Sequence, residues 1–231
     1  MNGRGITIED IKKIVPFSQG STEIFLTGLW SNRKPVHMDK TSPCRQACPI
    51  GNDIPRAFYE ASMGHYDQAL RIFRQENPLP GVCGRVCYHP CEIKCNRKDY
   101  DEPVNVRGFE RFLSDNGKVE IDREKVARQR HEKIAIIGSG PAGLSASYHL
   151  ARLGFAVTIF EALPKPGGML RYGIPEYRLP KDILDREIMY IQQLGVDIKT
   201  GVKVGNDLSL AQIRKNYQAT FLALGAHASM Q

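Results

Sequence analysis

The sequence lacks the features of a membrane or secreted protein. No apolar run approaches the roughly 18 residues that a bilayer-spanning helix needs. Its first residues show no signal-peptide pattern, and it has no internal repeat or low-complexity segment. These absences predict a cytoplasmic protein without a membrane span, in which cysteine thiols stay reduced.

The signature of a nucleic-acid-binding protein is also missing. The net charge is +7, but 32 basic residues are interleaved with 25 acidic ones, and no basic run is paired with stacking aromatics. Such a distribution is typical of a solvated surface. A basic face can also speed encounter with an acidic electron carrier. We therefore expect no nucleic-acid partner.

Hydrolytic catalysis is not indicated either, because no Ser-His-Asp set and no pair of carboxylates stands out. The six histidines are scattered, and most are expected to be surface or packing residues. His37 and His89 lie near cysteines and are candidates for a place beside a metal site. No catalytic residue is assigned from the sequence.

The six cysteines are the most informative residues present. They form one C-x3-C-P pair and one C-x3-C-x3-C-x3-C run, with cysteines at Cys44, Cys48, Cys83, Cys87, Cys91 and Cys95. In a reducing compartment, clustered cysteines usually bind metal or do chemistry. The run has helical spacing, but Gly84 and Pro90 favour a turn that wraps a cluster. A cubane takes four protein ligands, usually thiolates, so the pattern favours an iron–sulfur site.

Zinc and disulfides are the alternatives. Zinc sites usually show cysteine pairs set well apart, and six thiols exceed one tetrahedral site. Disulfides are rare in the cytoplasm, and a chain of 231 residues does not need them for stability.

A nucleotide fingerprint follows about forty residues after the last cysteine. The segment 134–137 is predicted to be a short buried strand, and Gly-Ser-Gly-Pro-Ala-Gly follows it at 138–143. Gly138 permits the sharp turn, Gly140 lets the backbone approach a pyrophosphate, and Gly143 lets the next helix pack on the strand. Glu161, at the end of the second strand, can accept the ribose hydroxyls. The sequence therefore predicts a dinucleotide site in a parallel βαβ unit.

FAD and NAD both remain open on this pattern. A second glycine pair, Gly167–Gly168, comes soon after Glu161, and Arg178-Leu-Pro follows it. Close passage of backbone beside a long bound cofactor favours FAD.

The chain is long enough for two modest domains. We expect an N-terminal lead-in at 1–40, a helical iron–sulfur domain at 41–115, a charged linker at 116–132 and an α/β Rossmann-like domain at 133–231. Helices are expected at 6–15, 54–61, 67–74, 104–113, 143–153 and 181–193, and strands at 134–137, 156–160, 196–199 and 219–224.

Together these motifs resemble the glutamate synthase small-subunit family. Cys44-x3-Cys48-Pro, Gly84-Arg-Val-Cys87-x2-Pro-Cys91-Glu-x2-Cys95 and Glu110-Arg-Phe are similar to its N-terminal iron–sulfur domain. Dihydropyrimidine dehydrogenase and sulfite-reductase-associated iron–sulfur flavoproteins carry the same module. The glycine loop, Tyr172-Gly-Ile-Pro and Leu222-Ala-Leu-Gly225 look like the first half of that family's FAD domain.

The resemblance implies a flavoprotein that takes hydride from NAD(P)H on FAD and passes single electrons through [4Fe-4S] clusters. Cys48, Cys87 and Cys91 would hold one cluster, with Glu110 as a ligand or neighbour, and Cys44 and Cys95 would belong to another. The implied FAD-binding residues are Gly138, Ser139, Gly140, Pro141, Ala142, Gly143, Glu161, Ala162, Gly167, Gly168, Met169, Arg178, Val204 and Gly225.

Two departures from the family pattern matter. The family has a further C-x2-C at about Val36 and Asp39, where this sequence has no cysteine. Either Cys83 and Asp39 substitute in the second cluster, or that cluster is absent. The family also inserts an NAD(P)H domain after Gly225 and then completes the FAD domain, whereas this sequence ends at Gln231.

The sequence thus predicts an electron-transfer module with FAD and one or two clusters, belonging to an NAD(P)H-linked oxidoreductase. The alternative is an electron-relay or scaffold subunit without flavin turnover. The implied partners are another redox subunit or a missing C-terminal part, with a ferredoxin-like acceptor also fitting. We expect apolar surface near Leu222 and Leu224 where the missing part would pack.

Overall fold

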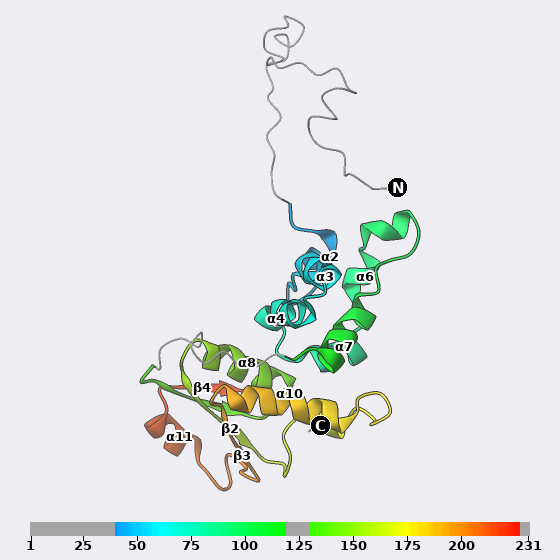
Figure 1. The fold of residues 1–231 in the computed structure, drawn as a ribbon. Coiled ribbons are helices and arrows are strands. Elements are labelled where there is room, and N and C mark those ends of the chain that lie inside the picture. The colour runs from blue at the N-terminus through cyan, green and yellow to red at the C-terminus, as the bar shows by residue number, and fades with distance from the viewer. Residues whose placement is uncertain (1–39, 119–129, 227–231) are drawn as a thin grey trace, which may run out of the picture. The chain divides into compact units, whose positions relative to one another are not determined.

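The computed structural model describes residues 40–118 and 130–226, and the residues from Thr41 onward belong to one compact unit. Figure 1 shows this unit as a set of short helices followed by a sheet with helices around it. The expected helix at 6–15, His37, and positions 36 and 39 lie outside the described residues, as does most of the linker at 116–132. The four domain boundaries given above stay predictions.

The first part of the unit is helical, as predicted. Its helices are α2 (Pro43–Ala47), α3 (Ile54–Ser62), α4 (Tyr66–Glu76), α5 (Pro80–Val86), α6 (Pro90–Ile93), the 3₁₀ helix η3 (Asn96–Asp99) and α7 (Val106–Asn116). Side-chain caps explain several starts. Asp53 accepts a hydrogen bond from the Arg56 amide at α3, and Asn105 accepts one from the Gly108 amide at α7. Because Asn105 is the cap, α7 starts two residues later than the sequence pattern predicted.

These helices pack around their own apolar core. Leu70 and Phe73 of α4 are almost fully buried, together with Leu113 of α7. The Phe58 and Phe109 rings stack with centroids 3.9 Å apart, and Cys91 belongs to the same cluster. The cysteine-bearing segments are therefore built on a packed scaffold.

The second part is a parallel sheet with helices. Its elements are β1 (Lys133–Ile137), α8 (Pro141–Arg152), β2 (Ala156–Glu161), α9 (Met169–Tyr172), α10 (Lys181–Gln193), β3 (Asp197–Thr200), α11 (Leu210–Asn216) and β4 (Ala219–Leu222). The strand order is β3-β2-β1-β4, and every pairing is parallel. The predicted βαβ unit is confirmed. Helix α8 starts at Pro141, two residues before the predicted start, because proline suits the first helical position.

The sheet carries a different core on each face. Ile136 and Ile159 belong to the larger core, which also contains residues of α8 and α10 and takes in Leu79 and Val82 from the cysteine-bearing helical part. The smaller core contains Ala135, Ile137, Phe160 and Ile213 of α11. Strand β4 lies at one edge of the described sheet. Leu222 and Leu224 are 58% and 63% exposed, as expected from the sequence.

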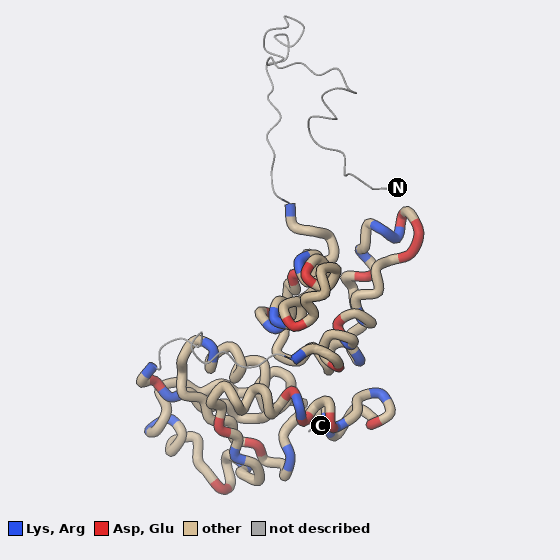
Figure 2. Tube along the Cα trace, viewed as in Figure 1, with Lys and Arg blue, Asp and Glu red and all other residues tan. Residues whose placement is uncertain are grey.

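Charge and hydropathy of the described residues agree with the sequence analysis. Figure 2 shows acidic and basic residues mixed in both the helical and the sheet parts. Of the helices in residues 40–118 and 130–226, none is long and apolar enough to cross a membrane.

Candidate functional site: a cysteine region and a dinucleotide loop

Three of the six cysteines are cap residues of short helices, and Cys44, Cys83 and Cys91 lie within α2, α5 and α6. Cys48 and Cys87 follow the last residues of α2 and α5 as C-caps, and Cys95 is the N-cap of η3. The predicted turn within the run of four is confirmed, because α5 ends at Val86 and α6 starts at Pro90. All six cysteines lie in the described residues as free thiols.

Cys48, Cys87 and Cys91 are brought near one another. Burial, followed by the negative charge of Cys48, raises the pKa of Cys91 to about 12, and Cys87 contributes in the same direction. Cys48 and Cys44 also pack against the apolar cluster that contains Cys91. Their assignment as ligands of one cluster stays a prediction.

No group of three or more His, Cys, Asp or Glu residues within 40–118 and 130–226 is gathered tightly enough to hold a metal ion.

Glu110 lies beside this thiol group in a buried hydrogen-bond network. Its carboxylate accepts hydrogen bonds from Asn77 Nδ2 at 2.7 Å and faces His89 Nε2 at 3.2 Å. The other ring nitrogen of His89 lies 2.9 Å from the Cys87 carbonyl oxygen. Burial raises the pKa of Glu110, against the opposing effects of His89 and Asn77. Both carboxylate oxygens thus already have a protein partner, and the role of Glu110 as a ligand or neighbour of a cluster stays a prediction.

The His89–Glu110 pair must share an additional proton. Both ring nitrogens of His89 face oxygen acceptors, but a neutral imidazole carries only one N–H. Either His89 is an imidazolium or Glu110 is protonated and donates to it. Burial opposes charge on His89, but its hydrogen bonds to Glu110 and Cys87 raise its pKa overall.

His89 also has an unusual backbone, with φ of 49° in the left-handed region. In this conformation its amide N–H donates to Cys87 Sγ at 3.3 Å. The sequence offered only its position between Cys87 and Pro90 as a signal. Its burial and its link to Glu110 were not predictable from that spacing.

The other three cysteines are Cys83, Cys44 and Cys95, and Cys83 lies close enough to Glu110 and Cys87 for their charges to act on its thiol. Burial, followed by the charge of Glu110, raises the pKa of Cys83 to about 12. Its thiol lies 3.7 Å from Asn77 Oδ1, and the Cys44 thiol donates to Ser42 Oγ at 3.2 Å. The assignment of Cys44 and Cys95 to a second cluster stays a prediction.

The glycine loop between β1 and α8 has the geometry that its sequence predicted. A Cβ on Gly138, whose φ is +103°, would lie 2.2 Å from the Ala223 carbonyl oxygen. One on Gly143 would lie 2.0 Å from the Gly138 carbonyl oxygen, so α8 can approach β1 only with glycine there. At Gly140 no atom lies within 4 Å of the Cβ position. The loop is therefore closed by packing at two glycines and open at the third, where a ligand would approach.

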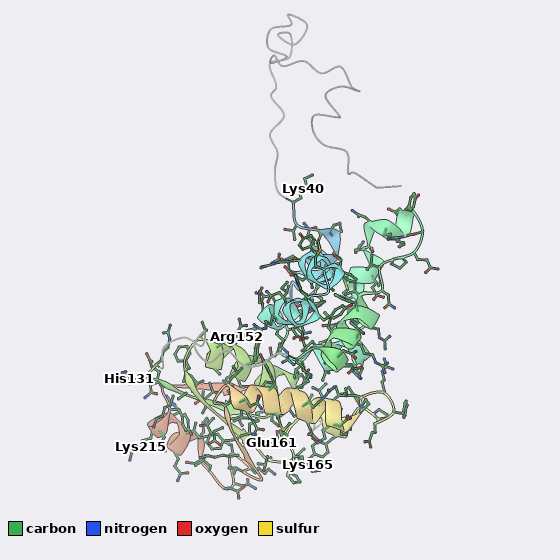
Figure 3. The ribbon with its side chains drawn as sticks, viewed as in Figure 1. Lys40, His131, Arg152, Glu161, Lys165 and Lys215 are labelled. Atoms are coloured by element: carbon green, nitrogen blue, oxygen red, sulfur yellow. The ribbon has the colours of Figure 1, made fainter. Side chains whose placement is uncertain are left out.

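Glu161 is tied into the same loop. Its Oε2 accepts hydrogen bonds from the Ser139 amide at 2.8 Å and from the Ser139 hydroxyl, and its Oε1 accepts one from the Leu163 amide. Figure 3 labels Glu161, at the end of β2. The sequence predicted a role in ribose binding but not these internal bonds. Oε1 keeps a further lone pair for a hydroxyl donor.

The second glycine pair lies against the first loop. The Gly167 amide donates to the Ser139 carbonyl at 3.1 Å, and a Cβ on Gly168 would lie 2.8 Å from Gly140 Cα. Met169, which follows, is 54% exposed. The structure thus brings the two predicted glycine segments together.

The remaining predicted cofactor residues are Pro141, Ala142, Ala162, Arg178, Val204 and Gly225. Pro141 and Ala142 are exposed in the first turn of α8, and Ala162 is exposed directly after β2. Arg178 is exposed, Val204 packs against the smaller core, and Gly225 follows β4 with φ of +70°. Their contact with a cofactor stays a prediction.

Comparison with protein families identifies both parts of the chain by class. Residues 38–121 match the family model described as dihydropyrimidine dehydrogenase domain II, 4Fe-4S cluster. Residues 136–190 match the NAD(P)-binding Rossmann-like domain. These matches, with the observed elements, confirm the predicted fold class of a helical iron–sulfur region followed by a parallel-sheet Rossmann-like domain.

Individual relatives are oxidoreductase subunits. The chain is 45% identical over 212 residues to the NADP(+)-dependent formate dehydrogenase subunit beta of Moorella thermoacetica, covering 82% of this chain and 30% of that protein. It is 42% identical to the NADPH-Fe(3+) oxidoreductase subunit beta of Geobacter sulfurreducens, covering 90% and 32%. It is 40% identical to the NAD-dependent dihydropyrimidine dehydrogenase subunit PreT of Salmonella typhimurium, covering 80% and 45%. The chain spans less than half the length of each of these relatives.

Proposed function

We propose that this chain is an electron-transfer module of an NAD(P)H-linked oxidoreductase, with FAD in the glycine loop and [4Fe-4S] chemistry at the cysteines. The observation that carries the proposal is the presence of both sites in one compact unit. The cysteine-bearing helix α5 contributes Leu79 and Val82 to the core beneath the dinucleotide-binding sheet. Two redox groups held on one packed body suit electron transfer between them.

The residues present fit an iron–sulfur cluster in part. Cys48, Cys87 and Cys91 supply three thiols, and a cubane exchanges single electrons when bound. Because these thiols are protonated at neutral pH when their pKa is raised, as at Cys91, iron binding must release protons. The Asn77–Glu110–His89 network fixes the segment between Cys87 and Cys91, and the His89 amide can donate to the Cys87 sulfur.

The glycine loop fits a dinucleotide, and FAD is our choice between the two candidates. The Gly140 backbone is open to a pyrophosphate, and the start of α8 faces the same region. Gly167–Gly168 lies against Gly140. Because these two residues have no side chains, their backbone can pass close beside a long cofactor. Bound FAD would accept a hydride and release electrons singly.

A complete enzyme would need parts outside this sequence. The relatives are longer and are named as subunits, so we propose that NAD(P)H binds in a further domain or on another redox subunit. A ferredoxin-like protein is a plausible class of acceptor, and the cytoplasm is the compartment where the thiols stay reduced. We expect no diaphorase turnover from the 231-residue chain with NADH or NADPH, and robust turnover would contradict this division of labour.

Anaerobic purification followed by iron, sulfide and flavin analysis tests the proposal. The expected preparation contains FAD, iron and acid-labile sulfide. Iron and sulfide without flavin would favour a relay subunit, and zinc without sulfide would contradict the proposal entirely.

A further inference from the structure

Helix α5, which carries Cys83 and ends before Cys87, lacks a cap from its own sequence. Its N-cap residue Leu79 makes no side-chain cap hydrogen bond. The first amides of a helix need acceptors from elsewhere. The Gly81 amide in the first turn finds one in Glu187 Oε1, at 3.4 Å and 106 positions away along the chain. A carboxylate on α10 therefore caps the cysteine-bearing helix.

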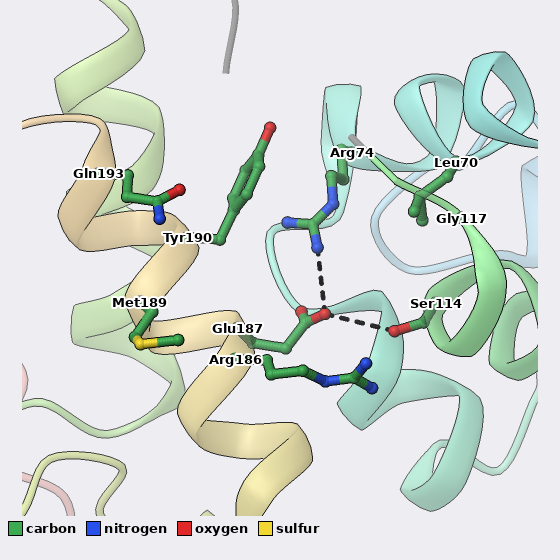
Figure 4. Close-up of a pocket in the computed structure, with 9 residues that line it drawn as sticks. All are labelled: Leu70, Arg74, Ser114, Gly117, Arg186, Glu187, Met189, Tyr190 and Gln193. Atoms are coloured by element: carbon green, nitrogen blue, oxygen red, sulfur yellow. Dashed lines mark hydrogen bonds and ion pairs between the residues drawn. The ribbon is translucent and has the colours of Figure 1, made fainter. Parts of the chain in front are cut away.

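Glu187 is held firmly in this place. Only 3% of the residue is exposed, and the same Oε1 faces Arg74 Nη2 at 3.2 Å and accepts a hydrogen bond from Ser114 Oγ at 3.4 Å. The Arg74 guanidinium lies over the Tyr190 ring at 3.8 Å. Figure 4 shows the carboxylate between these groups, at the edge of a pocket of about 160 Å³. One oxygen thus joins α4, α5 and α7 to α10.

The approach of α5 to α10 depends on glycine. A Cβ on Gly81 would lie 2.5 Å from Ser114 Oγ, 3.0 Å from Ile183 Cγ2 and 3.2 Å from Glu187 Oε1. Any larger residue must push α5 away from the carboxylate. The contact between the two helices therefore needs both the glycine on α5 and the carboxylate on α10.

The opposite end of α10 holds the dinucleotide-side segment. Lys181 Nζ, at the start of α10, donates to the Leu170 carbonyl at 3.1 Å and to the Ile174 carbonyl at 2.6 Å. Leu170 belongs to α9, which begins at Met169 directly after Gly168, and Ile174 follows the end of that helix. Helix α10 is thus bonded at Lys181 to the second glycine segment and at Glu187 to the cysteine helix.

We propose that Glu187 is a positioning residue, which together with Lys181 makes α10 a rigid strut that fixes helix α5 relative to the dinucleotide loop. The role in electron transfer rests on the function proposed above, while the strut itself does not. Electron-transfer rates fall steeply with the distance between redox groups, so a fixed separation keeps the transfer fast. The strut is the element that sets this separation.

Amide hydrogen exchange of the full chain tests the strut without any cofactor. In Glu187→Leu, the Gly81 to Cys83 amides should exchange about tenfold faster, as expected for the loss of a helix cap. Glu187→Gln keeps an acceptor oxygen and should stay within about twofold of the wild type. Gln192→Leu, an exposed site on the same helix, is the matched control and should leave α5 unchanged. Unchanged exchange in Glu187→Leu would overturn the inference.

A double variant separates positioning from stability. Glu187→Leu alone leaves Arg74 buried without its partner and can unfold the chain, whereas Arg74→Met/Glu187→Leu replaces both charges with apolar groups. Such replacements are often neutral for stability. We expect the double variant to melt at the wild-type temperature and still to show the faster α5 exchange. Wild-type protection in this variant would show that Glu187 does not cap α5.

The electron-transfer role needs a second measurement, on protein loaded with FAD and iron–sulfide. After photoreduction of the flavin, cluster reduction should be measurably slower in the double variant than in wild type or Glu187→Gln, because α5 is no longer fixed relative to the dinucleotide loop. Equal rates, with faster α5 exchange, would overturn the electron-transfer role but keep the strut. A wild-type chain that binds neither cofactor would end the proposed function and leave the exchange result standing.

Discussion

The dinucleotide loop and the cysteine region differ in what fixes their geometry. In the loop, a Cβ on Gly138 or Gly143 would lie 2.2 or 2.0 Å from a carbonyl oxygen, so backbone packing determines the shape. In the cysteine region, the thiols lie in short helices or at their ends, and burial raises the pKa of Cys83 and Cys91 to about 12. The loop is thus formed before its cofactor arrives, whereas the thiols become ligands only after iron displaces their protons.

Because of this difference, the two sites should respond differently to single substitutions. A change in the loop acts on folding or on cofactor access, depending on which glycine is altered. A change among the cysteines acts on cluster assembly and leaves the sheet intact. The predictions below test this contrast, from the largest expected effect to the smallest.

The largest effect is expected at the packed glycines. Gly138→Ala and Gly143→Ala place a Cβ against a carbonyl oxygen and should cost roughly 4 kcal/mol or more in the free energy of unfolding. Urea denaturation monitored by circular dichroism measures this loss.

Gly140→Ala is the control within the same loop, because its Cβ meets no atom within 4 Å. Its stability should change by less than about 1 kcal/mol, while FAD binding weakens because the backbone is no longer free to approach the pyrophosphate. Equal destabilisation by all three substitutions would contradict the packing account of the loop.

Among the cysteines, Cys87→Ala should have the largest effect on iron. The cluster held by Cys48, Cys87 and Cys91 should be the better populated, because the sequence lacks the upstream cysteine pair of the other site. The substitution should therefore remove the more intense low-temperature paramagnetic signal after reconstitution. If Cys95→Ala alone abolishes all iron binding, the assignment of ligands is wrong.

The pH dependence of stability should report on Glu187. Burial raises the pKa of Glu187 from 4.5 to about 7, against the opposing charges of Arg74 and Arg186. The folded state therefore keeps a proton that the unfolded state releases. The resulting stabilisation is fully present below pH 4.5 and is lost as pH rises through about 7, by up to roughly 3 kcal/mol.

Glu187→Gln removes this titration and should flatten the dependence, as thermal unfolding at pH 5 and pH 8 would measure. Asp197→Asn, at an exposed site of β3, is the control and should leave the wild-type slope in place. A slope that survives in Glu187→Gln would assign the pH dependence to another group.

A smaller effect is expected at His89. Asparagine tolerates the left-handed backbone, so His89→Asn should keep the turn and lose the contact with Glu110. The cost should be about 1–3 kcal/mol, because a buried carboxyl loses one of its two partners. Thermal unfolding measures it, with the exposed His65→Asn as the control at under about 0.5 kcal/mol. Equal effects at both positions would contradict the buried network.

The sequence predicted the features that depend on local chemistry. Gly138 and Gly143 have the packing roles that their spacing indicated, since a strand, a tight turn and a helix leave few alternatives, while the pyrophosphate contact of Gly140 stays a prediction. The break in the cysteine run was predictable because Gly84 and Pro90 disfavour one continuous helix.

Contacts between distant segments were not predictable. Glu187 caps a helix 106 positions away, and nothing in the pattern of an amphipathic helix marks one of its acids as buried. The same holds for Asn77 and His89, which meet at Glu110 only after α5 and α7 have packed. Glu161 was predicted at its place, but its bonds to Ser139 depend on the approach of two loops.

The most direct test of the central claim is to record the flavin absorption and the low-temperature paramagnetic spectrum of one anaerobically reconstituted preparation during stepwise reduction. The account predicts that flavin bleaching and a [4Fe-4S] signal appear in the same protein, and that Gly140→Ala weakens only the first while Cys87→Ala weakens only the second. A preparation that holds zinc and shows neither signal would contradict it.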